Sequence, residues 1–512
     1  MKQVFIFEDT VSDKNRSAKH GFCEAKCFWS FEKATKISDC EAGIYFCNFK
    51  SVIFEERIIM VDLTGKRVIV VGTGISGIGS AGLLEANGAI PVIYEGNTAV
   101  KESDVRGKLK AGSKAEIVIG AFTEEILENI ALAVLSPGVP TDADFVLKMK
   151  EKQIPVWGEI ELGYNYAKGK VLAITGTNGK TTTTSLVGQI MQEYFESVYI
   201  VGNIGNPYTQ AAPLMTEETV SVAEISSFQL ETIEYFHPQV SAILNVTPDH
   251  LDRHHTMENY VAAKEAVTLN QTKDNFCVLN YENEYTRDFG ARCPAQVVFF
   301  SSARKLENGL YLDGEEIFFA KNGEVTKLLN VKTDMNLVGI CNIENVMAAI
   351  GISMHAGVPM ENILATIKRF VAVEHRIEYV ATKKGVMYYN DSKATNTDAA
   401  IQGIKAMDKP TILIGGGYDK GSEYDDWIQS FDNKVKLLVL IGQTREKIAE
   451  CARKHGFEQI IFAESFEEAL DICVKEAVSG DAVLLSPACA SWGMFPNYEV
   501  RGKMFKEYVN KL

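Results

Sequence analysis

One segment, Ala173-Ile-Thr-Gly-Thr-Asn-Gly-Lys-Thr-Thr-Thr183, carries an apolar strand through a glycine turn directly into helix-forming residues. This pattern predicts a phosphate-binding loop, because its glycines let backbone N–H groups turn inward and the helix N-terminus adds a positive dipole. Lys180 would supply a cation, and Thr181 or Thr182 would offer a hydroxyl to Mg²⁺. The chain is therefore expected to consume a nucleoside triphosphate.

The glycines of this loop are spaced more closely than in the general P-loop. Two residues separate Gly176 from Gly179, whereas the general pattern places about four between its glycines. The alternative is a plain strand-to-helix turn with a surface lysine. The residues expected at the ATP phosphates are those of the loop and the first helical turn, namely Gly176, Thr177, Asn178, Gly179, Lys180, Thr181 and Thr182.

Length and composition indicate a globular protein with several cores. The 512 residues are enough for about three domains, and 46% of them are hydrophobic. No apolar run approaches the roughly 18 residues that a membrane span needs, and the N-terminus lacks the apolar core of a signal peptide. We therefore expect a cytoplasmic protein that does not bind a membrane. The net charge of −15, with no run of basic residues, argues against a nucleic-acid partner.

The first 59 residues read as an N-terminal extension of unknown role, since they show no sustained strand or helix period. Met60 stands directly before a segment that resembles the start of a compact α/β domain. The spacings of the four cysteines in this extension fit no strong zinc pattern, and those cysteines are Cys23, Cys27, Cys40 and Cys47. The other six cysteines are scattered among apolar residues and are expected to be reduced core residues.

Three series of short β-branched runs alternate with helical stretches, which predicts a parallel α/β fold. The series begin at Lys66, at Val171 and after Arg376. They suggest domains at 60–159, 160–372 and 373–512. The expected strands of the first series lie at 67–71, 90–94, 116–119 and 133–135.

A second nucleotide-like motif opens the first series. Gly72-Thr-Gly-Ile-Ser-Gly77 follows a strand and opens a helix, and Glu95 ends the next strand, as in dinucleotide-binding folds. Alone, the motif would support an NAD-dependent dehydrogenase. Its glycines indicate only that a pyrophosphate approaches the backbone closely. Both NAD and UDP-sugars contain a pyrophosphate. The ATP-like loop about 100 residues later and the motifs below argue against NAD.

Two polar clusters follow apolar strands further along the chain. Glu224 closes one strand, and a carboxylate at that end beside a phosphate loop is well placed for Mg²⁺. His250 follows the next strand in Asn245-Val-Thr-Pro-Asp-His-Leu-Asp252. A lone histidine there is more often structural, but its company with Glu224 and the phosphate loop favours a site.

These motifs stand in the order found in the Mur ligases, and from about Met60 to Leu512 the chain resembles that family. The motifs are Gly176–Thr181, Glu224–Glu231, Asn245–Asp252, Tyr260–Lys264, His375–Glu378, Asn390–Asn396 and Leu485–Ser491. The resemblance implies three domains: a Rossmann-like N-terminal domain that binds UDP, a P-loop ATPase-like central domain and a Rossmann-like C-terminal domain that closes over ATP. It also implies a monomer.

Within the family, the chain looks most similar to members that join D-glutamate to UDP-N-acetylmuramoyl-L-alanine with ATP. The similarity implies that Lys180 and Thr181 meet phosphates and one Mg²⁺. Glu224 and His250 would anchor two magnesium sites together with Lys264, which matches a lysine that the family carries as a carbamate. A carbamate makes chemical sense there, because an ammonium cannot ligate Mg²⁺ whereas a carbamate offers anionic oxygens. The expected catalytic residues are Lys180, His250 and Lys264.

The resemblance also implies the remaining ligand contacts. Arg376, Asp391, Asn342 and Asn345 would hold ATP. D-glutamate would meet Thr395, Lys420, Ser491 and Tyr498, since one cation and several hydroxyls suit a dicarboxylate. The UDP substrate would meet Gly74, Ile75, Ser76, Glu95, Ser136 and Asn203.

Some alternatives stay open. Another Mur ligase or a folylpolyglutamate synthase would share the ATP and magnesium residues, although the Asp-Asn-Pro-Arg signature of the diaminopimelate-adding relatives is absent. An NAD-dependent oxidoreductase would leave Lys180, Glu224 and His250 unexplained, and a non-catalytic nucleotide-binding protein would leave the metal ligands without a purpose. No arginine follows Tyr94, where a cation would be expected for the UDP pyrophosphate. The role of Trp492 is also open: it either packs against other side chains or touches substrate.

Overall fold

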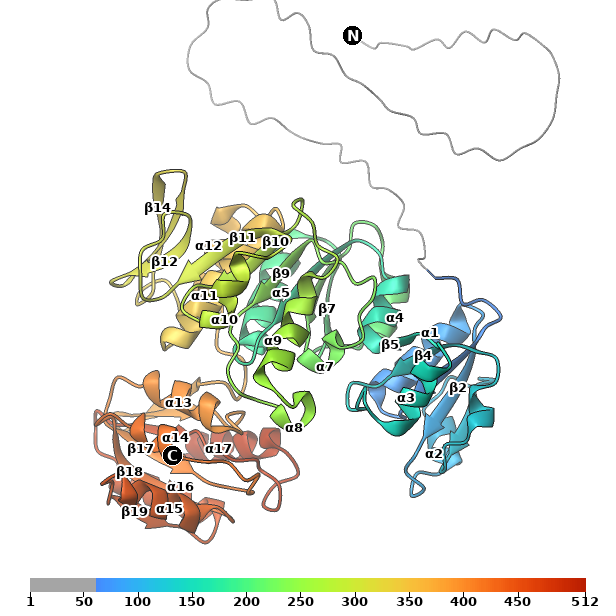
Figure 1. Cartoon of the computed structure of the whole chain (residues 1–512). Helices are drawn as coiled ribbons and strands as arrows, with labels where there is room; N and C mark the ends of the chain where they lie inside the picture. The colour runs from blue at the N-terminus through green and yellow to red at the C-terminus, as the bar shows by residue number, and fades with distance from the viewer. Residues whose placement is uncertain (1–60) are drawn as a thin grey trace, which may run out of the picture. The chain divides into compact units, whose positions relative to one another are not determined.

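The computed structural model describes residues 61–512. The predicted extension at 1–59 and its four cysteines lie outside this range. The described residues form three sheets with helices on both faces (Figure 1), so the predicted α/β class is confirmed. Within 61–512, no helix is long and apolar enough to cross a bilayer.

The first sheet is parallel and has the strand order β3-β2-β1-β4-β5. The order reverses beside β1, so the turns after β1 and β4 lie next to each other at a topological switch point, where α/β sheets bind ligands. Its strands are β1 (Arg67–Val71), β2 (Ile90–Glu95), β3 (Glu116–Ile119), β4 (Ile130–Leu135) and β5 (Val156–Gly158). Its helices are α1 (Ile75–Ala86), α2 (Glu102–Arg106), η1 (Glu124–Leu127) and α3 (Asp144–Glu151).

The second sheet has nine strands in the order β14-β13-β12-β11-β10-β9-β6-β8-β7. β6 (Lys170–Thr175) lies between β8 (Val220–Glu224) and β9 (Val240–Ile243), with Ile174 opposite Glu224 and Thr175 opposite Ile243. This pairing brings the phosphate loop, Glu224 and the segment after β9 to one edge. The other strands are β7 (Val198–Gly202), β10 (Phe276–Asn280), β11 (Gln296–Ser301), β12 (Gly309–Asp313), β13 (Glu316–Lys321) and β14 (Glu324–Asn330).

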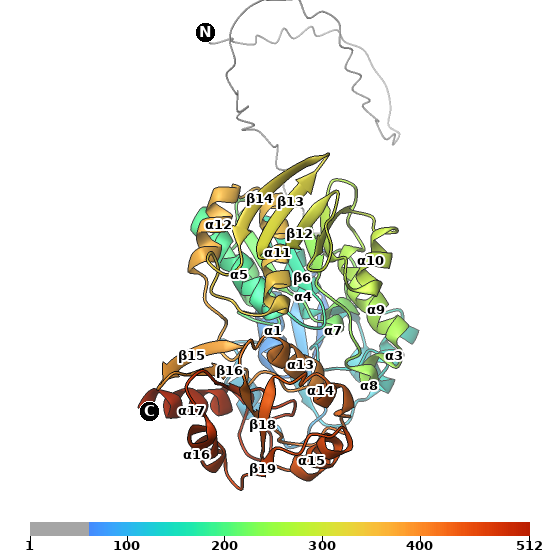
Figure 2. The same ribbon diagram turned by 90° about the vertical axis from the view of Figure 1, so that its left-hand side faces the viewer.

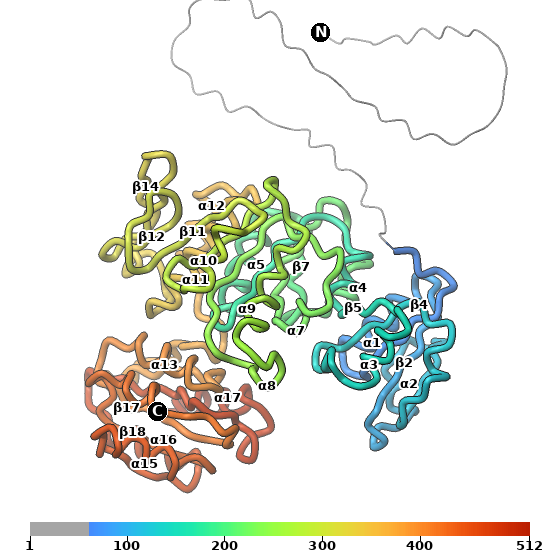
Figure 3. Tube along the Cα trace, viewed as in Figure 1, coloured from blue at the N-terminus to red at the C-terminus, as the bar shows by residue number. Residues whose placement is uncertain are grey.

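Apolar side chains cover both faces of the second sheet. Figure 2 shows α5 and α12 on one side and α9 and α10 on the other. The antiparallel strands β12 to β14 extend the parallel part, and the tube in Figure 3 shows them beside β11. The helices are α4 (Glu159–Tyr166), α5 (Lys180–Tyr194), α6 (Tyr208–Ala211), η2 (Ala212–Leu214), α7 (Ser227–Leu230), α8 (Leu251–His254), α9 (Met257–Glu265), η3 (Ala266–Thr268), α10 (Glu284–Gly290), α11 (Ile340–His355) and α12 (Met360–Arg369).

The third sheet has the order β15-β16-β20-β17-β18-β19 and is parallel except for β15. Asn390 and Ile414 both pair with Leu485, so the segments after β16, β17 and β20 meet at one edge. The strands are β15 (Glu378–Lys383), β16 (Val386–Asn390), β17 (Thr411–Gly415), β18 (Val435–Leu440), β19 (Ile460–Phe462) and β20 (Ala482–Leu485). The helices are α13 (Thr397–Lys405), α14 (Asp425–Gln429), α15 (Arg445–Lys454), α16 (Phe466–Glu476) and α17 (Tyr498–Lys511).

Candidate active site

The phosphate loop between β6 and α5 depends on two glycines. Gly176 and Gly179 have φ angles of +145° and +85°, which L side chains rarely adopt. A Cβ atom at Gly179 would lie only 2.2 Å from the Asn345 Oδ1 atom. Glycine at this position therefore lets α11, which carries Asn345, approach the loop closely.

Hydrogen bonds from the segment after β9 fix the shape of the loop. The Asn178 backbone N–H donates to Asn245 Oδ1 at 2.8 Å, and the Asn245 amide donates back to the Asn178 carbonyl at 3.2 Å. The Thr177 hydroxyl donates to the Thr247 carbonyl at 3.2 Å and lies 3.1 Å from the Tyr260 hydroxyl. Protein groups thus hold the loop in place, which lowers the cost of binding a phosphate.

Two lysines meet at the start of the loop. Lys180 Nζ donates to the carbonyls of Gly176 and Thr177 at 2.8 and 2.9 Å, and Lys264 Nζ donates to Gly176 at 2.9 Å. Lys264 is only 1% exposed and has no ion-pair partner within the described chain. Burial and, next, the neighbouring Lys180 charge hold the pKa of Lys264 well below its usual range. Its neutral amine is therefore far more populated than in an exposed lysine.

Glu224, at the end of β8, is 1% exposed. Its Oε1 atom accepts a hydrogen bond from the Asn203 amide at 2.7 Å, while its Oε2 atom is buried and has no hydrogen-bond partner among residues 61–512. A buried carboxylate oxygen without a partner is costly unless a cation lies against it. The donor types at this edge of the sheet, a carboxylate and the hydroxyl of Thr181 at the start of α5, therefore fit Mg²⁺.

His250 lies in the segment that joins β9 to α8. His250 precedes α8 with a φ angle of +54°, its imidazole is half exposed, and its ring centroid lies 4.9 Å from that of Phe228. Within residues 61–512, no hydrogen bond joins His250 to Glu224 or Lys264. Its assignment as a metal ligand stays a prediction.

A cavity of about 260 Å³ lies beside the loop. Several residues not anticipated from the sequence also line it, including Glu282, Asn283 and Gln402. The expected ATP-binding residues that it brings together are Asn178, Gly179, Thr182, Asn342, Asn345, Arg376 and Asp391.

Strained backbone flanks Arg376 on the wall of this cavity. His375 and Ile377 have φ angles of +67° and +44°, and this region is unfavourable for a β-branched residue. Such strain persists where surrounding structure enforces it, commonly at ligand sites. The Arg376 side chain has no ion-pair partner in the described chain, so its guanidinium remains available for a phosphate.

Lys393 is a site residue that the sequence did not single out. Its ammonium donates to the Thr181 hydroxyl at 3.2 Å, and burial lowers its pKa to about 8. The only sequence signal was its position inside the Asn390–Asn396 motif. It adds a second cation, after Lys180, at the start of α5.

Asp391, at the end of β16, is buried and accepts hydrogen bonds from the Ser486 hydroxyl at 2.7 Å and the Ile377 backbone N–H at 3.2 Å. Burial raises its pKa from 3.8 to about 7. The folded protein therefore keeps a proton on Asp391 that the unfolded chain loses above about pH 4.

This difference predicts a pH-dependent stability. Between about pH 4 and 7, Asp391 should lower the free energy of unfolding of the unliganded protein by about 1.4 kcal/mol per pH unit, because the folded state binds the extra proton. Asp391→Asn should flatten that slope, measured as denaturant midpoints at several pH values. The exposed control Asp408→Asn should not change it. Parallel profiles for wild type and Asp391→Asn would contradict the buried titration.

The first sheet forms a second glycine turn. Gly74 precedes α1, Ile75 is exposed, and Ser136 follows β4, where its hydroxyl would lie 2.6 Å from a Cβ atom at Gly72. The Glu95 carboxylate accepts a hydrogen bond from Thr73 at 2.7 Å. The structure thus gathers the turn residues Gly74, Ile75, Ser76, Glu95 and Ser136 at the switch point, whereas Asn203 donates to Glu224.

Lys108 supplies a cation at this turn that the sequence did not reveal. Its ammonium donates to the Thr73 carbonyl at 3.2 Å. Lys108 follows α2, well separated from the glycine motif in the chain, so only the folded arrangement brings it there.

A further cavity of about 400 Å³ gathers all four residues expected at the amino acid, which are Thr395, Lys420, Ser491 and Tyr498. Trp492 also lines it and is 55% exposed. Lys420 Nζ lies 5.5 Å from the centre of the Trp492 ring, and Tyr418 meets that ring edge-on at 5.7 Å. Within the described residues, Lys420 forms no ion pair with a carboxylate. Its ammonium can therefore bind the carboxylate of a ligand.

Three segments of this chain match models of known protein domains. Residues 66–158 match the Mur ligase MurD-like N-terminal domain, 174–353 the Mur ligase middle domain, and 375–489 the Mur ligase glutamate ligase domain.

Individual relatives match over most of this chain. It is 60% identical to UDP-N-acetylmuramoylalanine–D-glutamate ligase of Lachnospira eligens, with 88% of this chain and 100% of that protein covered. It is 44% identical to the protein of that name in Clostridioides difficile, with the same coverage. The UDP-N-acetylmuramate-alanine ligase of Thermotoga maritima shares the fold, with a TM-score of 0.54 and 18% identity over 87% of this chain and 99% of that one.

Proposed function

Because this chain belongs to the Mur ligase family, we propose that it joins D-glutamate to UDP-N-acetylmuramoyl-L-alanine in peptidoglycan synthesis, converting ATP to ADP and phosphate. The observation that carries the substrate assignment is the 60% identity to a D-glutamate ligase over that protein's full length. ATP dependence and a requirement for Mg²⁺ are general in the family. We also propose that the protein is cytoplasmic and monomeric.

The amino-acid cavity supports a dicarboxylate substrate. Lys420 would meet one carboxylate of D-glutamate, while Thr395, Ser491 and Tyr498 offer polar groups that fix its orientation. Lys420 lies over an aromatic face rather than in an ion pair, so no internal salt bridge has to break when substrate binds.

The reaction requires activation of a carboxylate, since its negative charge and resonance resist attack by an amine. A carboxylate oxygen of the alanyl substrate attacks the γ-phosphorus of ATP, the bond to the β-phosphate oxygen breaks, and an acyl phosphate forms. Lys180 and Lys393 stabilise charge on the transferring phosphoryl group. The neutral amine of D-glutamate then attacks the carbonyl carbon. Its nitrogen loses a proton to a base, and the tetrahedral intermediate expels phosphate to leave an amide.

A bound Mg²⁺ would supply positive charge that offsets the negative charge of the phosphates. Glu224 and the Thr181 hydroxyl would hold one ion, while His250 and a carbamate on Lys264 would hold a second. The lowered pKa of the buried Lys264 amine supports the carbamate. Its neutral nitrogen adds to CO₂ and loses a proton, giving an anionic oxygen ligand.

The UDP substrate would bind at the switch point of the first sheet. Backbone N–H groups of Gly74, Ile75 and Ser76 at the start of α1 would face the pyrophosphate, with Ser136 on the opposite side. Lys108 would supply the missing cation. Glu95 would meet the uridine moiety, and Asn203 would contact the substrate beside Glu224.

Phosphate release provides the test. Purified protein with Mg²⁺-ATP and UDP-N-acetylmuramoyl-L-alanine should release phosphate only when D-glutamate is added. L-Glutamate, meso-diaminopimelate and L-lysine serve as matched controls. Release with another of these amino acids would move the chain to a sister ligase, and no release with any of them would refute the substrate assignment.

Trp492 should contribute to amino-acid binding by positioning Lys420. Trp492→Ala is expected to raise KM for D-glutamate about two- to fivefold, since a cation–π contact at an exposed site is worth roughly 0.5 to 1 kcal/mol. Trp492→Phe should retain most of the affinity, and KM for ATP should stay unchanged in both variants. Equal effects on both substrates in steady-state kinetics would instead indicate a general loss of structure.

A further inference from the structure

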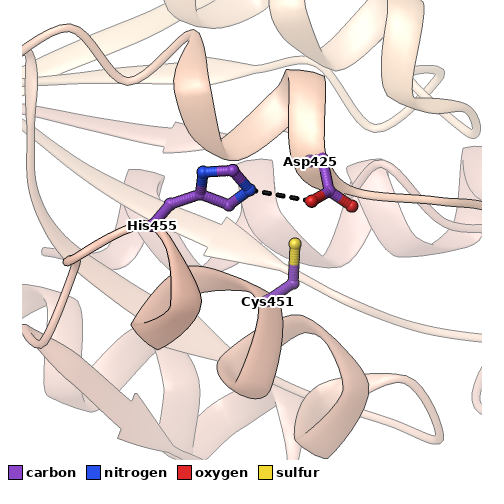
Figure 4. A group of neighbouring side chains, drawn as sticks. All are labelled: Asp425, Cys451 and His455. Atoms are coloured by element: carbon purple, nitrogen blue, oxygen red, sulfur yellow. Dashed lines mark hydrogen bonds and ion pairs between the residues drawn. The ribbon is translucent and has the colours of Figure 1, made fainter.

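Three side chains of the kinds that bind metal ions lie together among the helices that cover the third sheet. They line neither of the two cavities described above. Figure 4 shows Asp425, Cys451 and His455 pointing toward one another. Each offers one ligand atom, and these three atoms lie within 4.8 Å of one another. The proposed ligase reaction uses none of them.

Local structure explains why the three meet. Cys451 lies in the last turns of α15 and His455 follows its end, so their spacing of four residues places both on one helix face. Asp425 is the first residue of α14. His455 Nε2 lies 2.8 Å from Asp425 Oδ1, and the Cys451 thiol also hydrogen-bonds to the Asp425 carboxylate.

We propose that Asp425, Cys451 and His455 bind one Zn²⁺ ion. Sulfur, imidazole nitrogen and a carboxylate oxygen form a donor set that suits Zn²⁺, whereas Mg²⁺ and Ca²⁺ take oxygen ligands. Tetrahedral zinc needs ligand atoms about 3.3 to 3.8 Å apart. His455 Nε2 and Asp425 Oδ1, at 2.8 Å, would have to separate slightly, and any pair near the 4.8 Å limit would have to close by about an ångström. Three protein ligands leave a fourth position for water.

The surroundings permit an ion to enter. A cavity of about 240 Å³ adjoins the cluster, and it is lined by Glu423, Tyr424, Asp425, Lys447, Glu450, Cys451 and Lys454. Lys454 donates to Asp425 Oδ1 at 2.8 Å and is the resident cation. Its side chain is 71% exposed, so it can turn into solvent when a metal takes its place.

Binding has a defined proton balance. Zn²⁺ forms bonds to the thiolate, the neutral imidazole and the carboxylate, and the proton of the Cys451 thiol is released to solvent. The bound ion would tie the start of α14 to the end of α15. It should therefore raise the melting temperature of the protein.

Cobalt binding tests the proposal, because Co²⁺ occupies zinc sites and a thiolate ligand gives it a characteristic near-ultraviolet charge-transfer band. The full-length chain carrying Cys→Ser changes at positions 23, 27, 40 and 47 excludes binding by the N-terminal cysteines. After treatment with a chelator, this protein should bind one equivalent of Co²⁺ with that band, and Zn²⁺ should displace it.

Three variants in this background sharpen the result. Cys451→Ser should abolish the charge-transfer band, and His455→Gln should weaken binding tenfold or more. Lys454→Gln should bind metal more tightly, because the competing ammonium is gone. Unchanged ligase activity with Mg²⁺-ATP would show that each variant is folded. A band that persists in Cys451→Ser, or no cobalt binding by the parent protein, would overturn the proposal.

Discussion

Lys264→Ala is expected to lower kcat by about 10³-fold, the upper end of the loss when one electrostatic stabiliser is removed from an active site. Lys264 is buried beside the phosphate loop and donates to the Gly176 carbonyl at 2.9 Å. Removing it deletes the proposed carbamate ligand of Mg²⁺ and leaves the metal site short of negative charge. Steady-state kinetics at saturating substrates measure the effect.

The carbamate on Lys264 can be detected independently of enzyme activity. Protein equilibrated with ¹³C-labelled bicarbonate should show a carbamate carbon resonance that disappears in Lys264→Ala. The exposed control Lys168→Ala should keep both the resonance and the activity. Lys264→Arg should be as impaired as Lys264→Ala, because a guanidinium does not form a carbamate under these conditions. Wild-type activity in Lys264→Arg would contradict the proposed metal ligand.

Lys180→Ala is expected to lower kcat by at least about 10³-fold, since its ammonium is proposed to stabilise charge that develops on the transferring phosphoryl group. In this structure the Lys180 ammonium donates hydrogen bonds to the carbonyls of Gly176 and Thr177. A short swing of its side chain would carry it from the loop to a phosphate. Single-turnover phosphate release separates this chemical step from product release.

Comparing Lys180→Ala with Lys393→Ala shows how much each of the two cations contributes to the rate of the chemical step. Lys393 donates a hydrogen bond to the Thr181 hydroxyl at the start of α5, so both variants should be slow in chemistry. Retained single-turnover rates in Lys180→Ala would show that this lysine serves only structure.

The sequence predicted the parallel strands well because their β-branched runs are bounded by glycine and proline. Expected strands at 67–71 and 116–119 match β1 and β3, while the strand expected at 133–135 begins earlier, at Ile130. The antiparallel strands β12 to β14 were not anticipated. Their exposed faces and short turns give a weaker local pattern than buried parallel strands do.

The turn between β6 and α5 and the position of Glu224 at the end of β8 were predictable because their signal is local: a strand, a turn and a polar residue at the strand's end. Lys108 and Lys393 were not, because each joins its site only through tertiary packing. The cation–π contact between Lys420 and Trp492 likewise depends on two separate loops meeting. The domain boundaries and the individual ligand roles stay predictions.

Oxygen transfer tests the proposed reaction most directly. UDP-N-acetylmuramoyl-L-alanine labelled with ¹⁸O in both oxygens of its terminal carboxylate is incubated with the protein, Mg²⁺-ATP and D-glutamate. If the carboxylate attacks the γ-phosphorus, mass spectrometry will find one ¹⁸O in the released phosphate and one in the new amide. Unlabelled phosphate, or no amide product containing D-glutamate, would contradict the account.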